Sequence, residues 1–263
     1  MNSRRIKIEE NIKVEKDNRE HTLVIEGRNA VIEAFRSEKP IDKLFVLDGC
    51  QDGPVRTIVR EAKKHDTIIN FVTKERLAQI SLTGKHQGVI AYAAAYDYAS
   101  VDDMFKLAEE KGEDPFIIVL DNIEDPHNLG AIIRTANLAG AHGVIIPKRR
   151  AVGLTATVAR TSAGALNYTP VAKVTNIAKT MEELKKRGIW FVCADMNGES
   201  MYRCNLKGPI GLVIGNEGEG VGRLVKEKCD FTASIPMKGD IDSLNASVAA
   251  GVLAYEIVRQ RMN

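Results

Sequence analysis

The chain has few cysteines, and their spacing argues against two kinds of stabilised small fold. Its 263 residues contain four cysteines, with no C-x-x-C pair: Cys50, Cys193, Cys204 and Cys229. Such wide spacing argues against a zinc site and against a disulfide framework. We therefore expect free thiols, no metal, and a reducing compartment, with the cytoplasm as the default location.

Long apolar runs and a strong net charge are also missing. No apolar segment reaches the roughly 18 residues that a membrane span needs, and no apolar signal core follows Met1. The net charge is only +2, so any surface that attracts nucleic acid must be local. The fingerprints G-x-x-x-x-G-K-[ST] and strand-G-x-G-x-x-G are absent, which argues against an NTPase and a Rossmann dehydrogenase.

The order of strand-like and helix-like segments predicts two α/β domains. Residues 1–20 contain eleven charged residues and are expected to form a mobile extension. Residues 21–95 alternate short strands and helices, which predicts a small mixed or parallel sheet. Residues 96–115 lose apolar density and are interpreted as a linker with one helix at Val101–Lys111. Residues 116–263 alternate regularly and predict a parallel-sheet α/β domain.

The second domain opens with a segment in which chemistry is expected. A buried strand is predicted at Phe116–Leu120, followed by a polar loop at Asp121–Asn128 and a helix from near Leu129. Arg134 lies on the second turn of that helix. Open α/β sheets place their sites beyond the carboxyl ends of their strands, so this loop is a candidate site.

Two further polar segments follow predicted strands of the same sheet. Residues 215–220 read GNEGEG and follow a strand at Ile210–Ile214. A tight turn explains these glycines but not the carboxylate of Glu217 between them. Residues 235–245 lead into the last helix, for which Ser243 is a natural N-cap. Capping leaves Asn245, a poor helix former, without a structural reason.

The last helix is predicted at Leu244–Arg261. Apolar residues recur about one turn apart along it, at Leu244, Val248, Val252 and Tyr255 or Glu256. A stripe with this spacing predicts that the corresponding face of the helix is buried.

The three polar segments are expected to converge, because loops at the carboxyl ends of parallel strands meet at one edge of the sheet. They supply hydrogen-bonding and cationic groups without a cysteine nucleophile, metal-ligand spacing or Ser-His-acid arrangement: Asn128, Arg134, Glu217, Ser243 and Asn245. Such a set suits group transfer between two bound substrates, in which orientation supplies most of the rate.

In this order and spacing, three motifs resemble those of the SpoU (TrmH-like) RNA ribose 2′-O-methyltransferases: N-I-x-D-P-x-N-x-G-x-x-x-R-T-A, G-x-E-G-x-G and I-P-M-x-G-x-x-x-S-L-N-x-S-V-A. The GRNAV segment from Gly27 and the TGKHQGV segment from Thr83 resemble the accessory N-terminal domain of the RlmB-type members. That domain is related to a ribosomal protein that binds kinked RNA. The resemblance covers almost everything after His21.

The resemblance implies a fold and a reaction. The fold is an α/β-knot (SPOUT) domain with a deep trefoil knot, preceded by a small ribosomal-protein-like RNA-binding α/β domain. The reaction is transfer of a methyl group from S-adenosylmethionine to a ribose 2′-hydroxyl of structured RNA by a homodimer. The N-terminal domain favours a guanosine of large-subunit (23S) ribosomal RNA. The alternatives are a transfer-RNA or antibiotic-resistance 2′-O-methyltransferase, or a non-catalytic RNA-binding ribosome-assembly factor.

The resemblance also implies roles for particular residues. The five polar residues named above match the family's catalytic and RNA-positioning residues. The implied cofactor contacts are Gly215, Asn216, Ile235, Met237 and Leu244, with Asp195 nearby. Relatives often carry a small residue at the position of Asn216. RNA contacts are expected in two glycine-flanked loops and one basic run, with ordinary solvated loops as the alternative: Arg28, Asn29, Lys85, His86, Arg149 and Arg150.

Arg134 matches the residue that the family is proposed to use as its base. Because an arginine stays protonated in proteins, the favoured role here is phosphate binding and stabilisation of the developing alkoxide. The proton then passes to a phosphate or to water. Asn128 and Asn245 are expected to orient Arg134 and the ribose. For Glu217 the structural alternative is a buried carboxylate–arginine brace.

Overall fold

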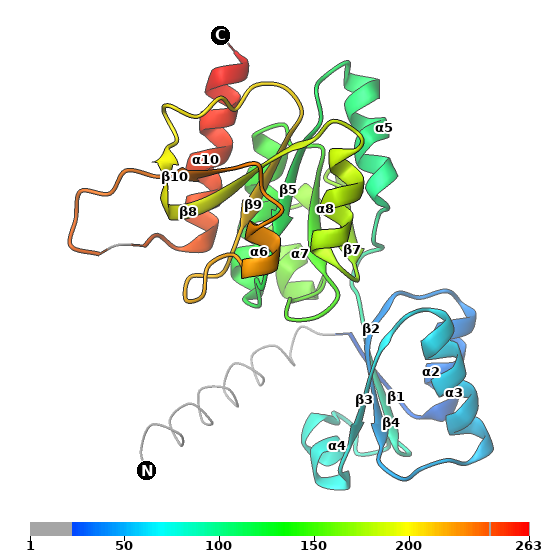
Figure 1. The fold of residues 1–263 in the computed structure, drawn as a ribbon. Helices are drawn as coiled ribbons and strands as arrows, with labels where there is room; N and C mark the ends of the chain where they lie inside the picture. The colour runs from blue at the N-terminus through cyan, green and yellow to red at the C-terminus, as the bar shows by residue number, and fades with distance from the viewer. Residues whose placement is uncertain (1–22, 242, 263) are drawn as a thin grey trace. The chain divides into compact units, whose positions relative to one another are not determined.

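The computed structural model describes residues 23–241 and 243–262, which form two compact units (Figure 1). The first unit comprises the described residues up to Asp97 together with residues 153–157. The second unit comprises residues 98–152 and the described residues from Val158 onward. The predicted mobile extension, residues 1–20, lies outside the described part of the chain.

The first unit is built on a four-stranded mixed sheet, one of the two arrangements that the sequence allows. Its strands lie in the order β1-β4-β2-β3, with β4 antiparallel to both neighbours and β2 parallel to β3. They are β1 (Leu23–Glu26), β2 (Ile41–Leu47), β3 (Ile68–Val72) and β4 (Val89–Ala93). The helix at Gly53–Lys64 makes the crossover from β2 to the parallel edge strand β3.

Helices cover both faces of this small sheet. α2 (Arg28–Arg36) and α3 (Gly53–Lys64) pack on one face, where Val31 and Ile58 are fully buried. α4 (Lys74–Ile80) covers the other face through Leu77 and Ile80. The alternation of apolar side chains along β2 and β4 allows both faces to be covered.

Glu26, the last residue of β1, holds the start of the loop that carries Lys85 and His86. Its carboxylate accepts hydrogen bonds from the hydroxyls of Ser81 (2.8 Å) and Thr83 (2.6 Å) and from the backbone N–H of Leu82. Burial opposes ionisation of this carboxyl, but the hydrogen bonds, led by that of Thr83, outweigh it and hold the pKa of Glu26 below its ordinary value.

The variant Glu26→Gln is expected to lower the free energy of unfolding at neutral pH by about 1–2 kcal/mol, because both carboxylate oxygens accept hydrogen bonds and glutamine keeps one acceptor. The folded-state pKa is lowered, so this stabilisation is present above the unfolded-state pKa and disappears as pH falls through the folded-state pKa. Urea unfolding of both proteins from about pH 7 to about pH 3 measures the closing gap. Glu33→Gln, at an exposed ion pair, is the control. An equal gap at both pH values would contradict the assignment.

The second unit is built on a six-stranded sheet in which all neighbours are parallel, so the predicted parallel α/β class is confirmed. The order is β10-β8-β9-β5-β6-β7. The strands are β5 (Phe116–Leu120), β6 (Gly143–Pro147), β7 (Val171–Val174), β8 (Trp190–Ser200), β9 (Ile210–Ile214) and β10 (Phe231–Ser234). The central strands β5 and β9 are buried along their whole length, as their continuous apolar sequences predict.

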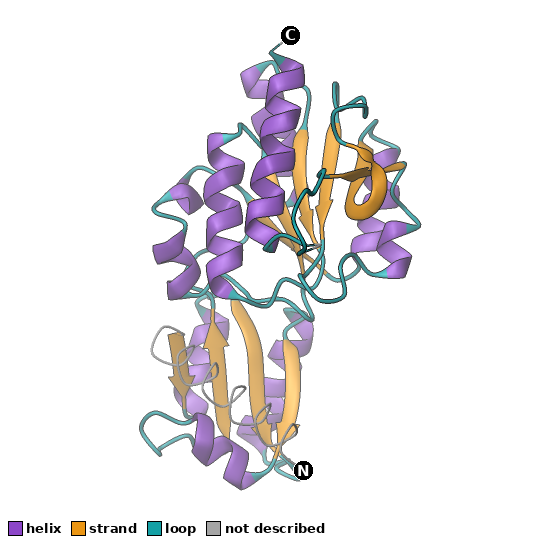
Figure 2. Cartoon of the chain, turned by 90° about the vertical axis from the view of Figure 1, so that its left-hand side faces the viewer, coloured by secondary structure: helices purple, strands orange, loops and turns teal. Residues whose placement is uncertain are grey.

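Helices cover both faces of this sheet as well (Figure 2). On one face lie α5 (Val101–Lys111), α8 (Ile177–Lys185) and α9 (Arg223–Lys226). On the other face α6 (Pro126–Leu138) packs beside α10 (Ala246–Arg261), with α7 (Ala156–Thr161) and a 3-10 turn (Ala165–Asn167) following in the chain after β6. Among the helices of the described residues, none is long and apolar enough to cross a membrane.

The helix α5 falls within the segment that the sequence suggests as a linker. Its bounds are those predicted, but Met104 is fully buried in the core of the second unit, against residues of β5 and β6. The sequence of this helix has the low apolar density of a linker, because only two of its side chains, Met104 and Ala108, are buried. Two buried side chains and a Ser100–Asp103 capping box are enough to fix it to the sheet.

The helix α10 differs from its prediction in both its start and its buried face. It begins at Ala246, and its N-cap is Asn245 rather than Ser243. The predicted apolar stripe is wrong at Val248 and Tyr255, which are 49% and 51% exposed, whereas Glu256, the alternative to Tyr255, is buried. The buried face consists of Ala246, Ala250, Leu253, Ala254, Glu256, Ile257 and Gln260. The helix is apolar on two sides, and the side with small alanines packs inward.

Candidate active site

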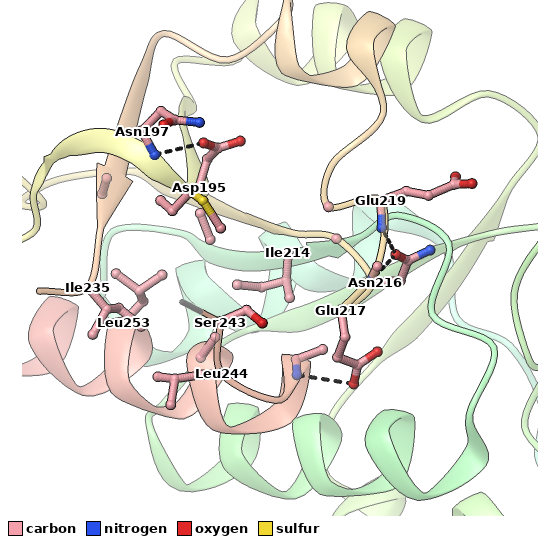
Figure 3. Close-up of a pocket in the computed structure, with 18 of the residues that line it drawn as sticks. Asp195, Asn197, Ile214, Asn216, Glu217, Glu219, Ile235, Ser243, Leu244 and Leu253 are labelled. Carbon is pink, nitrogen blue, oxygen red and sulfur yellow. Dashed lines mark hydrogen bonds between the residues drawn. The ribbon is translucent and has the colours of Figure 1, made fainter. Parts of the chain in front are cut away.

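Three polar side chains from three separate segments meet at the N-terminal ends of α6 and α10. Oε1 of Glu217 accepts hydrogen bonds from the side-chain amides of Asn128 (2.6 Å) and Asn245 (3.0 Å). It also accepts one from the backbone N–H of Ala246 (3.2 Å), drawn in Figure 3. Nδ2 of Asn245 donates to Oδ1 of Asn128 as well (2.9 Å). We call Asn128, Glu217 and Asn245 the polar cluster.

Local capping signals position two members of this cluster. Asp125 caps α6 by accepting a hydrogen bond from the N–H of His127 (2.9 Å), and Pro126 occupies the first helical position. The helix therefore begins before the predicted start near Leu129, and Asn128 lies in its first turn. Asn245 caps α10 through Oδ1, which accepts from the N–H groups of Ser247 and Val248. Its one amide thus both caps a helix and binds Glu217.

Arg134 lies on α6, less than two turns beyond Asn128, and its side chain is exposed. Within residues 23–241 and 243–262 it forms no hydrogen bond or ion pair. The carboxylate–arginine brace considered for Glu217 is absent from the same residues, since the partners of Glu217 are two amides and an N–H. The guanidinium of Arg134 is therefore available to an anion from solution.

A cavity of about 260 Å³ opens beside the polar cluster (Figure 3). Its wall comes from the loop after β9, from a bulge in β8 and from the segment before α10. All six residues predicted to contact a cofactor line it: Asp195, Gly215, Asn216, Ile235, Met237 and Leu244. Glu217 and Ser243 line it too, whereas Asn128, Arg134 and Asn245 are not among its lining residues. Ser243 thus lies at the cavity rather than at the cap of α10.

The loop after β9 requires glycine at its first position. A Cβ on Gly215 would lie 2.0 Å from the carbonyl carbon of Gly220 and 2.3 Å from the nitrogen of Val221. Oδ1 of Asn216 closes the loop by accepting from the N–H groups of Gly218 (3.0 Å) and Glu219 (2.6 Å). Asn216 is therefore a turn-forming residue here, which explains a side chain larger than relatives often carry.

A bulge in β8 supplies the opposite wall. In the pairing of β8 with β10, Thr232 lies opposite Cys193 and Ala233 opposite Glu199, so residues 194–198 leave the ladder. Asp195 lies in this bulge, where its carboxylate accepts from Nζ of Lys226 (2.7 Å) and from the N–H of Asn197 (2.9 Å). Burial opposes ionisation, but these two hydrogen bonds outweigh it and hold the pKa of Asp195 below its ordinary value.

Two residues that the sequence analysis missed fix these walls. Asp121, buried directly after β5, accepts a hydrogen bond from the N–H of Gly222 (2.8 Å) and so holds the far end of the loop after β9. A carboxylate immediately after a fully buried strand is the signal that would have found it. Lys226, on α9, fixes the carboxylate of Asp195 by a hydrogen bond. The two residues are far apart in the sequence, so no local pattern predicts that they pair.

The predicted RNA contacts of the first unit lie in the first turn of α2, which holds Arg28 and Asn29, and in the loop that holds Lys85 and His86. The expected loop at Arg28 and Asn29 is therefore wrong, because α2 begins at Arg28. Arg28 forms an ion pair with Asp52 (2.6 Å), and its Nε donates to the carbonyl of Gln87 (3.0 Å), so it joins the start of α2 to the loop of Lys85. Asn29 and Lys85 are exposed. Nδ1 of His86, in the same loop, accepts from the N–H of Gly88 (3.0 Å). Arg28 therefore has a structural role besides any contact with RNA.

In the second unit, Arg149 and Arg150 are exposed in the loop after β6 and are not among the lining residues of the cavity. Arg150 has a φ of 55°, which a sharp bend of the chain imposes. Among the described residues, no group of three or more His, Cys, Asp or Glu side chains is arranged to hold a metal ion.

Two family models match the chain, one in each unit. The model described as the SpoU rRNA Methylase family matches residues 115–255, and the model for RNA 2′-O ribose methyltransferase substrate binding matches residues 24–99. A Bacillus subtilis relative, YacO, is named as a TrmH-family tRNA/rRNA methyltransferase. It is 53% identical over 244 residues, covering 92% of this chain and 97% of the relative. A Staphylococcus saprophyticus relative of the same family name is 47% identical, covering 91% and 96%.

Solved structures share the fold. The crystal structure of the SpoU methyltransferase AviRb from Streptomyces viridochromogenes, in complex with the cofactor AdoMet, matches with a TM-score of 0.58 and 26% identity. The match covers 92% of this chain and 91% of that chain. The structure of an RNA methyltransferase of the TrmH family from Porphyromonas gingivalis matches with a TM-score of 0.54 and 24% identity, covering 95% and 96%.

Proposed function

Because this chain belongs to the SpoU family and is an S-adenosylmethionine-dependent RNA ribose 2′-O-methyltransferase, we propose that it methylates a guanosine of large-subunit (23S) ribosomal RNA. The observation that carries the proposal is that Glu217 both lines the cavity and belongs to the polar cluster. In addition, the first unit matches the family model for RNA 2′-O ribose methyltransferase substrate binding. The proposal includes the trefoil knot, cytoplasmic action, an RNA-binding domain at residues 21–95 and a catalytic domain at residues 116–263.

The cavity fits the cofactor on its own chemistry. A flat heteroaromatic group needs close backbone approach. The loop of Gly215 offers backbone without a side chain, because it turns so tightly that a Cβ at this position would collide with Gly220. Apolar side chains of the cavity suit the apolar part of the cofactor, and the ionised Asp195 suits its cationic part. We assign the cofactor contacts to Gly215, Asn216, Ile235, Met237, Leu244 and Asp195. When bound, the cofactor supplies an electrophilic methyl group on a sulfonium.

The polar cluster and Arg134 act on the RNA side of the reaction. The cluster fixes the N-terminal ends of α6 and α10 relative to the cavity, because its hydrogen bonds join both helices to Glu217. Arg134 projects from the helix so fixed and binds a phosphate of the target nucleotide. Its charge stabilises the alkoxide that develops as the ribose hydroxyl attacks. The hydroxyl proton passes to a phosphate or to water, since the guanidinium is already protonated.

Mapping ribose methylation in cells tests the substrate. A 2′-O-methyl group protects the adjoining phosphodiester from alkaline hydrolysis, so sites can be located in ribosomal and transfer RNA from cells with and without this gene. We expect one guanosine of large-subunit RNA to lose its protection, and a plasmid copy of the gene to restore it. Loss of protection only in transfer RNA would refute the substrate assignment and support the alternative substrate.

We also propose a homodimer that buries the second apolar side of α10. Val248 and Tyr255 are half exposed there, and Leu138 of the adjoining helix α6 is 65% exposed. Exposed apolar side chains gathered on two packed helices are typical of an interface between subunits. The same helices carry Asn245 and Arg134, so the interface would lie near the site.

The variant Tyr255→Glu is expected to shift the protein from dimer to monomer in sedimentation equilibrium, by at least about tenfold in dissociation constant, because a charge would be buried at the interface. Leu224→Glu, on the exposed side of α9, is the matched control and should sediment as the wild type does. A monomeric wild type, or a Tyr255→Glu protein that remains dimeric, would contradict this interface.

A further inference from the structure

A second cavity, of about 380 Å³, lies between α3 and the edge strand β3 of the first unit. Its floor is apolar, formed by Val55 and Val59, and the ring of Phe71 stands at its rim. That ring is 58% exposed, although it belongs to a strand whose other residues are partly covered. A large exposed aromatic side chain beside a cavity is typical of a binding surface rather than of packing.

Three cations surround the same cavity. Arg56, Arg60 and Lys63 are spaced i, i+4 and i+7 along α3, so they project from one face of the helix. All three are exposed. Arg56 and Lys63 have no hydrogen-bonded or ionic side-chain partner in the described part of the chain. Arg60 has a loose, exposed ion pair with Glu61 (3.6 Å), which contributes little. No carboxylate is among the lining residues of this cavity.

An exposed aromatic ring with flanking cations has the chemistry that binds single-stranded nucleic acid. A base that has left its helix stacks on the ring, and the phosphates on either side of it pair with the cations. An apolar partner protein would leave three charges unpaired at its interface, which costs free energy. The charge and the aromatic ring together therefore favour RNA over an apolar protein surface.

One end of the cavity adjoins Arg28, a residue already predicted to contact RNA. Cys50 lines one end of it, and Nη2 of Arg28 lies 3.8 Å from Sγ of Cys50 and 2.6 Å from the carboxylate of Asp52. The segment 50–52 thus joins the α3–β3 cavity to the first turn of α2, which holds Arg28 and Asn29. A strand of RNA bound at the start of α2 can therefore extend into the cavity within the first unit.

We propose that the α3–β3 cavity binds one unstacked base of single-stranded RNA on Phe71, with its neighbouring phosphates on Arg56, Arg60 and Lys63. The site deepens the proposed function and rests on it, because it would recognise an unpaired nucleotide of the RNA substrate other than the one that is methylated. It also gives the first unit a selectivity for single strands over duplexes, since a paired base cannot stack on the ring.

The full-length protein and a fluorescein-labelled ten-nucleotide RNA, single-stranded or annealed to its complement, test the site by fluorescence anisotropy. Phe71→Ala is expected to weaken binding of the single strand by about tenfold or more, with an unchanged salt dependence, and Phe71→Trp to restore it. Arg60→Glu is expected to weaken binding and to reduce the slope of log affinity against log salt by about 0.7 for each phosphate that the protein no longer neutralises. Lys39→Glu, an exposed cation outside the cavity, is the control.

The outcomes separate this site from the substrate assignment. If Phe71→Ala binds the single strand as tightly as the wild type while the wild type methylates ribosomal RNA, the site is refuted and the proposed function stands. If Phe71→Ala weakens RNA binding but the wild type methylates only transfer RNA, the site stands and the substrate assignment fails. If Phe71→Ala alters sedimentation rather than RNA affinity, a second copy of the chain covers the cavity and the site is refuted.

Discussion

Replacing Arg134 with alanine is expected to lower kcat for methyl transfer by roughly 100- to 1,000-fold, the loss typical when one preorganised donor to a developing oxyanion is removed. The affinity for S-adenosylmethionine should stay unchanged, because Arg134 is absent from the lining of the cavity and contacts no member of the polar cluster. Single-turnover methyl transfer and calorimetric titration of the cofactor measure the two quantities separately.

Two further variants define what Arg134 does. Arg134→Lys keeps the charge but loses the planar fork of donors, so an intermediate rate is expected. A lysine variant that keeps most of the wild-type rate across the pH range would count against any special geometry at this residue. Arg149→Ala, an exposed cation in the loop after β6, is the control and should change KM more than kcat.

The second large effect is expected at Gly215. Gly215→Ala should abolish measurable cofactor binding, with a loss of affinity of about 100-fold or more, because its Cβ would lie 2.0 Å from the backbone of Gly220. The nearest atoms that this Cβ would meet are all backbone atoms of Gly220 and Val221, so no flexible side chain can move aside. The loop of residues 215–220 must therefore open, and the cavity wall with it. Calorimetric titration with S-adenosylmethionine measures the loss.

Gly218 offers a matched control in the same loop. A Cβ there would meet only Oδ1 of Asn216, at 3.8 Å, which is ordinary van der Waals contact. Gly218→Ala should therefore bind the cofactor within a few-fold of the wild type. Equal losses in both variants would show that the loop tolerates no side chain anywhere. Unchanged binding in Gly215→Ala would contradict the claim that the cavity wall depends on the close packing of Gly215 against Gly220.

Much of the second unit follows from its sequence, because buried parallel strands carry a strong pattern. β5 and β9 have the predicted bounds, and both are continuous apolar runs that a two-sided sheet demands. The meeting of Asn128, Glu217 and Asn245 also follows from topology, since each lies in a segment beyond a parallel strand or at the helix that covers it. The roles of these residues in the reaction remain predictions.

Other features could not be predicted from the spacing of residues alone. Ser243 and Asn245 are both good N-cap residues. Only the hydrogen bonds of Asn245, which accepts from the N–H of Ser247 and donates to Glu217, decide between them. Apolar residues occupy two sides of α10, so periodicity cannot tell the side that packs inward from the side that stays exposed. The α3–β3 cavity has no signal in the sequence, because Phe71 and the cations of α3 lie in separate elements.

The most direct test of the central claim is transfer of labelled methyl from S-adenosylmethionine to RNA taken from cells that lack this gene, with wild type and Arg134→Ala side by side. After digestion to nucleosides, we predict label as 2′-O-methylguanosine in large-subunit ribosomal RNA with the wild type, and its near-complete loss with Arg134→Ala. Label confined to transfer RNA, or an equal amount of label with both proteins, would contradict the account.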